Sequence, residues 1–143
     1  MGWQSYHLDQ AAHELVIAYR DRSEALNQAH KMRMMVAFGL ERFWGEHLRL
    51  NREKDKAKSD YWKDTWNKLV EIMAQAGVVI PNDDVSSGET AAIKTMADKL
   101  WSFPEKQRKV ALAVLTQLCD SMVWWTQRYK PANGDNSGGD EDE

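Results

Sequence analysis

The sequence predicts an all-α protein, built as roughly five helices around one apolar helix near its C-terminal end. Two observations carry this prediction. The longest apolar run, VALAVLTQLCDSMVWW at 110–125, repeats its large side chains at the three- and four-residue spacing of a helix. The chain of 143 residues also contains only 8 Gly and 3 Pro, which leaves long segments free of helix breakers. This length is sufficient for one domain with its own core, and we expect a single helical domain at 1–130.

The first two helices are expected at about 6–22 and 24–50, because apolar residues recur there at helical spacing. The core-facing residues of the second segment are Ala25, Ala29, Met32, Val36, Leu40 and Phe43. Met34, Met35 and Phe38 lie off this face, which indicates a second apolar side. Gly39 and Gly45 weaken the helix or allow another backbone to come close.

Ser59 or Asp60 is the expected N-cap of a third helix, which ends before a loop at 78–88. The apolar face of this helix consists of Trp62, Trp66, Leu69, Val70 and Met73. Within the loop, the short VVI run suits a strand, but the sequence offers it no partner strand. Ser86 and Glu89 form an S-x-x-E capping box that predicts the start of a fourth helix.

The fifth helix, at 104–130, is the central one. Ser102 and Glu105 form a second capping box, and Pro104 lies in the first turn, where its missing N–H costs nothing. The main apolar stripe consists of Ala111, Leu115, Leu118, Met122, Trp125 and Tyr129. Further apolar residues make this helix apolar almost all round, so it is expected to be buried. Polar side chains form one narrow strip, and the strip contains Gln117, Ser121, Trp124 and Arg128.

The net charge of −3 is unevenly distributed. The segment 131–143 holds five of the 22 acidic residues and no basic one, so 17 acids and 19 bases remain in the body. This segment has no core residues and is predicted to be a disordered acidic tail. No secretory leader or membrane span is recognisable, and one cysteine cannot form an intrachain disulfide. We therefore expect a cytoplasmic protein without membrane contact.

Chemical motifs are few. Asp9 and His13 lie one helical turn apart, but two ligands do not make a zinc site, so no metal or cofactor is expected. The segment from Arg42 to His47 resembles the R-x4-x6-H spacing of HEPN ribonucleases, which are small helical bundles. The resemblance implies that Arg42 and His47 hold a scissile phosphate and assist proton transfer from a 2′-OH without a metal. The alternative interpretation is a solvent-facing Arg and a His at the rim.

Basic residues flank the third and fifth helices and suggest contact with RNA or single-stranded DNA. They are Arg49, Arg52, Lys54, Lys56, Lys58, Lys106, Arg108 and Lys109. Trp62 and Trp66 follow the first group as possible stacking platforms, although their spacing favours the core. Small helical subunits of RNA-guided CRISPR effector complexes have a similar size and architecture, which makes this the second functional hypothesis. Interleaved acids favour the simpler view that the charged segments are solvated surface.

Seven Trp residues are many for a bundle of this length, and exposed Trp is characteristic of interface hot spots. Trp124 and Arg128, on the polar strip, and Trp3, near the N-terminus, are the predicted interface residues. The leading hypothesis is therefore a non-catalytic interaction subunit that docks into a larger assembly or self-associates. The partner is expected to be a protein or a second copy, and a nucleic acid is the alternative.

Overall fold

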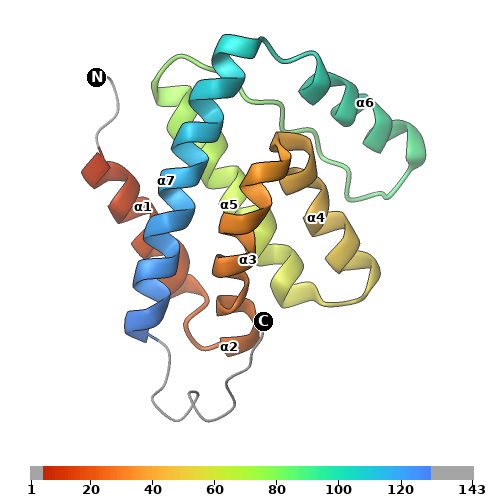
Figure 1. Cartoon of the computed structure of the whole chain (residues 1–143). Coiled ribbons are helices and arrows are strands. Elements are labelled where there is room, and N and C mark those ends of the chain that lie inside the picture. Colours follow the sequence, from red (N-terminus) through yellow and green to blue (C-terminus); the bar gives the residue numbers. More distant parts are fainter. Residues whose placement is uncertain (1–4, 130–143) are drawn as a thin grey trace.

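The computed structural model describes residues 5–129, with side chains from residue 7 onward. All regular elements in this part of the chain are helical, which confirms the all-α prediction (Figure 1). They are α1 (Ser5–Ala18), α2 (Ser23–Leu26), α3 (Gln28–Met35), the 3₁₀ helix η1 (Val36–Phe38), α4 (Leu40–Arg52), α5 (Lys56–Gln75), α6 (Thr90–Trp101) and α7 (Glu105–Tyr129). Trp3, Lys130 and the acidic segment 131–143 lie outside the described residues.

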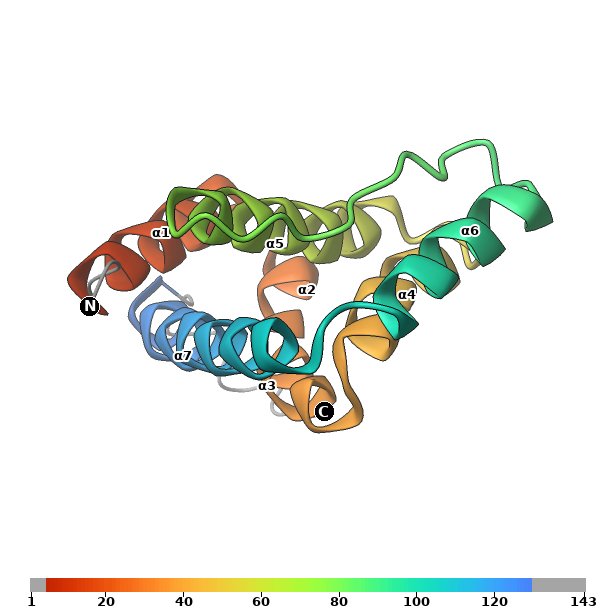
Figure 2. The same cartoon turned by 90° about the horizontal axis from the view of Figure 1, so that it is seen from above.

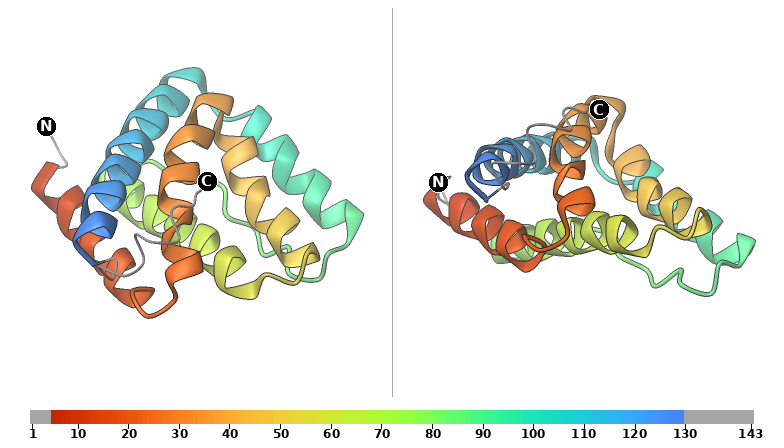
Figure 3. Two further views of the ribbon diagram at one scale, coloured as in Figure 1. Left: turned by 60° about the horizontal axis from the view of Figure 1, so that its bottom comes forward. Right: turned by 90° about the horizontal axis from the view of Figure 1, so that it is seen from below.

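The helices form two layers. Figure 2 shows α1 and α5 in one layer and α3 and α7 in the other, with the short α2 joining them. Helices α4 and α6 extend to one side, and the two views of Figure 3 show the same arrangement. Helix α7 packs mainly on α1 and α3, whereas α4 packs mainly on α5. Helix α7, the longest, therefore lies between α1 and α3 and also contacts α5.

The buried apolar side chains form one continuous cluster with members from each of the seven α-helices. The largest fully buried ones are Trp62, Trp66, Tyr61 and Phe43, and the ring of Phe43 lies 4.9 Å from that of Trp62. The indole N–H of Trp62 donates to Oε1 of Gln28 at 2.9 Å, so burial leaves it satisfied. Trp62 and Trp66 are thus core residues, as their spacing predicts.

The helix predicted at 24–50 is broken into α2, α3, η1 and α4. All six residues of its predicted core face are nevertheless buried. The main break is at Gly39, whose φ of +101° is a conformation that other residues adopt only with strain. The chain turns there, so that α3 can pack on α7 while α4 packs on α5.

Three predicted N-caps are wrong, and one of them, Ser102, is instead the C-cap of α6, because α7 begins only at Glu105. Helix α5 begins at Lys56, and Ser59 lies inside it with its hydroxyl donating to the carbonyl of His47 at 2.7 Å. Helix α6 begins at Thr90, and the N–H of Ser86 donates to Oδ1 of Asp84 in the preceding turn. Serine side chains bind neighbouring backbone in turns and tertiary contacts as readily as at helix starts. Helix α1 also ends earlier than expected, at Ala18.

Candidate interaction surface

Helix α7 is covered by its neighbours on one side and open to solvent along a stripe. The exposed residues at three- and four-residue spacing are Val110, Ala113, Gln117, Asp120, Trp124 and Arg128. This stripe contains Gln117, Trp124 and Arg128 of the predicted polar strip, and it extends further along the helix than predicted, to Val110. Val110, expected in the core, is 41% exposed, because α1, α3 and α5 leave this stripe uncovered.

Trp124 is the largest side chain of the stripe. It is 48% exposed, which agrees with its predicted place on the polar strip. The guanidinium carbon of Arg128 lies over its ring, 3.8 Å from the centroid, and the ring of Trp125 meets it edge-on at 4.8 Å. These contacts hold the indole in place while leaving half of it accessible.

Trp125 is half-buried, whereas its spacing predicts a core position. Its indole N–H donates to Oδ1 of Asp9 at 3.0 Å, and its ring stacks on His13 at 4.0 Å between centroids. Nε2 of His13 lies 2.7 Å from the hydroxyl of Tyr129. Polar residues of α1 cover Trp125 here, so the tertiary contact and not the helical period decides its exposure.

We call this group the aromatic surface, and its members are Asp9 and His13 of α1 with Trp124, Trp125, Arg128 and Tyr129 of α7. The sequence indicates Trp124 and Arg128, but it does not indicate that Asp9 and His13 join them. The one available signal is the one-turn spacing of Asp9 and His13, which resembles part of a metal site. Both side chains in fact bind aromatic residues of α7.

Arg42 and His47 do not form a joint site. They are five residues apart on α4, which places them about 140° apart around the helix. Arg42 is exposed, whereas His47 is only 8% exposed, and Nδ1 of His47 lies 2.5 Å from the carbonyl oxygen of Trp44. Burial lowers the pKa of His47. The description of His47 as a rim residue is wrong, and its buried ring is poorly placed to reach a phosphate.

The predicted nucleic-acid contacts fall into two separate groups. The α4–α5 hinge and the start of α7 lie at opposite ends of the bundle (Figures 1 and 3). Arg108 pairs with Glu41 in the first turn of α4, so the hinge group is separated from it by roughly the 20 Å length of that helix.

Most of these bases are neutralised by acids nearby. Arg49 pairs with Glu46 and Glu53, Lys56 with Asp60, Lys58 with Asp55, and Lys109 with Glu105. Arg52, Lys54 and Lys106 have no ion pair within the described residues. Three isolated cations do not make a continuous track for a phosphate backbone.

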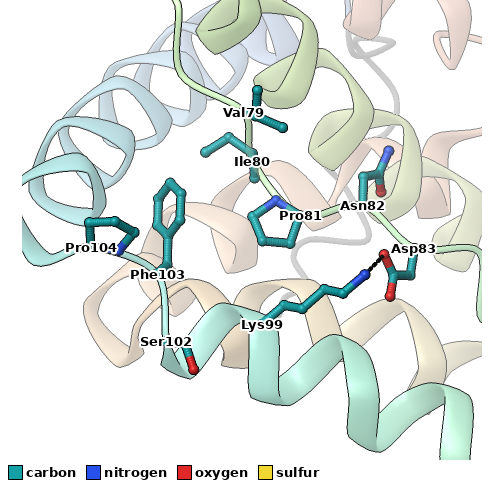
Figure 4. A pocket seen from close by; sticks show the side chains of 9 residues that line it. All are labelled: Val79, Ile80, Pro81, Asn82, Asp83, Lys99, Ser102, Phe103 and Pro104. Atoms are coloured by element: carbon teal, nitrogen blue, oxygen red, sulfur yellow. Dashed lines mark hydrogen bonds and ion pairs between the residues drawn. The ribbon is translucent and has the colours of Figure 1, made fainter.

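A cavity of about 490 Å³ lies between the 78–83 segment and the α6–α7 turn (Figure 4). Its apolar walls include Ile80, Pro81 and Phe103, and the indole N–H of Trp66 holds the segment by donating to the carbonyl of Pro81. The amino group of Lys99 pairs with Asp83 at 2.9 Å, so the charges at its edge compensate each other. Its lining residues include no histidine and no cysteine.

Among the residues with described side chains, no three His, Cys, Asp or Glu are grouped so that they could hold a metal ion. None of the described helices has both the length and the apolar character that crossing a bilayer requires. Comparisons with family models, with curated proteins and with solved structures find no match to this chain.

Proposed function

We propose that this chain is a non-catalytic interaction subunit that binds a protein partner through the aromatic surface on α7 and α1. The observation that carries the proposal is Trp124, a half-exposed indole fixed by Arg128 on one side and Trp125 on the other. An aromatic side chain that is already ordered loses little conformational entropy on binding. Trp and Arg are also the residue types most enriched in interface hot spots.

The other exposed apolar side chains lack this arrangement. Trp101 is more exposed than Trp124, at 61%, but no aromatic or cationic side chain contacts its ring within the described part of the chain. Met34 and Phe38 lie on α3 and η1 and are flanked by no second aromatic ring in that part. Single exposed apolar residues are normal on protein surfaces and need no functional explanation. What distinguishes the aromatic surface is that its two indole rings contact each other and that each also contacts a charged side chain, Asp9 or Arg128.

Trp124→Ala tests the proposal, and Trp101→Ala is the matched control. Both residues are exposed on helices, so each substitution should leave the free energy of unfolding within about 1 kcal/mol of the original chain. Only Trp124→Ala should weaken association, by roughly 2 kcal/mol or more. Affinity purification from the native cell, followed by titration with the recovered partner, measures the difference.

Treatment with nuclease during purification separates the protein and nucleic-acid hypotheses. A partner that remains bound after treatment and is lost with Trp124→Ala supports the proposal. A partner released by nuclease and unaffected by Trp124→Ala would instead indicate binding through the basic residues.

A further inference from the structure

The aromatic surface carries one charge of each sign, at opposite ends of a chain of contacts. The contacts run from Asp9 to Trp125 at 3.0 Å, from Trp125 to Trp124 at 4.8 Å between centroids, and from Trp124 to Arg128 at 3.8 Å. Neither Asp9 nor Arg128 has an ion-pair partner among the described residues. A negative edge, an aromatic centre and a positive edge therefore follow one another across α1 and α7.

This arrangement is complementary to itself. A two-fold axis through the aromatic centre would bring Arg128 of each copy to Asp9 of the other, with the two Trp124 rings in contact between them. Interfaces of two-fold dimers are isologous, which means that the same patch serves both subunits and must be self-complementary. We propose that the partner of this surface is a second copy of the chain. This inference rests on the proposed function and names its partner.

The surroundings favour a second copy over a nucleic acid. Asp9 would lie against any phosphate backbone bound over the rings and would repel it. Asp120, on the same stripe of α7, adds a second acid, although Arg33 pairs with it at 2.5 Å.

Ile17, 38% exposed and one turn beyond His13 on α1, extends the apolar area of the aromatic surface. A protein interface of ordinary size covers about 800 Å² per subunit, roughly a tenth of the 8254 Å² surface of this chain.

Charge reversal provides a direct test. Asp9→Arg places two positive charges at each end of the two-fold interface, and Arg128→Asp places two negative charges there. Sedimentation velocity of the full chain at about 1–300 μM should show the original protein at twice its 16.5 kDa mass at the upper concentrations. Each charge variant alone should sediment as a monomer, with the dissociation constant raised at least about 30-fold.

An equal mixture of the Asp9→Arg and Arg128→Asp chains should recover the dimer. In the mixed dimer, the two substituted positions face each other with opposite charges at one end, and the unchanged Arg128 and Asp9 face each other at the other end, so both ends are complementary again. Damage to the fold of either variant could not produce this recovery. Arg52→Asp is the matched control, because Arg52 is also an exposed, unpaired Arg in the last turn of its helix. It should leave the dimer unchanged.

Three outcomes would overturn the inference: a monomeric original protein over the whole range, charge variants that dimerise like the original, or a mixture that remains monomeric. Failure of the inference and failure of the proposed function remain distinguishable. A monomeric protein that loses its cellular partner with Trp124→Ala overturns the self-association alone. A dimer and a cellular partner that both tolerate Trp124→Ala overturn the proposed function as well.

Discussion

Lowering the pH from about 7 to about 5.5 should destabilise the fold through His47. Burial lowers the pKa of this imidazole below its ordinary value, and the charge of Lys63 acts in the same direction, while the bond to the Trp44 carbonyl opposes them. The unfolded chain therefore binds a proton more readily than the folded one. The stability that the neutral ring provides is complete above the ordinary histidine pKa of about 6.5. It is lost as the pH falls below that value toward the pKa of the folded state.

The size of the effect follows from proton linkage. In the limiting case of a folded imidazole that takes up no proton, an unfolded pKa of about 6.5 gives a loss of about 1.2 kcal/mol in the free energy of unfolding between the two pH values. This is an upper limit, because partial protonation of the folded state reduces it. It is a measurable part of the 5–15 kcal/mol by which domains are typically stable.

Urea unfolding followed by circular dichroism at the two pH values measures the loss. His47→Gln cannot gain the proton, so its stability should fall less over the same interval, by up to about 1.2 kcal/mol. The readout is the difference between the two pH values, which is independent of any constant cost of the substitution. His30→Gln, at an exposed position of α3, is the control and should fall like the original chain. Equal losses for the original chain and His47→Gln would refute the reasoning.

Three further predictions concern single positions in the fold. Gly39→Ala should cost about 1–2 kcal/mol, because its φ of +101° strains a residue with a side chain. Gly45→Ala should stabilise α4 by about 0.5–1 kcal/mol, because Ala favours helix and no neighbouring part of the fold lies within 4 Å of the added Cβ. Urea unfolding that shows the same sign for both substitutions would contradict this. Tyr61→Phe should leave the free energy of unfolding unchanged or raise it by up to about 1 kcal/mol, because the buried hydroxyl interacts with the side chain of Thr126 but makes no hydrogen bond of ordinary geometry within the described chain. A loss above about 1 kcal/mol would show that the two hydroxyls are paired. Cys119 is fully buried, and burial raises the pKa of its thiol, so a thiol reagent should label it only after unfolding; rapid labelling of the folded protein would show that α7 opens there.

Much of the helical pattern can be predicted from the sequence. The six apolar residues from Ala25 to Phe43 are all buried, although the helix expected to carry them is broken at Gly39. Spacing survives this break because each short helix keeps its own inward face, with Ala29 and Met32 buried on α3 and Leu40 and Phe43 buried on α4. Local hydrogen-bonding signals are less informative, since Ser59 and Ser86 bind other groups than the helix ends predicted for them.

The amino-acid sequence by itself determined the all-α class, the inner faces of the helices and the exposure of Trp124, because a helical period assigns each residue an angle on its own helix. Only the tertiary structure decided which sides of each helix are covered by a neighbouring helix. It leaves Trp125 half-buried under Asp9 and His13, residues 116 and 112 positions away in the chain, and it buries His47 on α4. The physical reason is that periodicity describes one helix at a time, whereas burial and charge pairing depend on the neighbour that packs against it. The aromatic surface exists because α1 crosses α7 at this point, and no local pattern specifies that crossing.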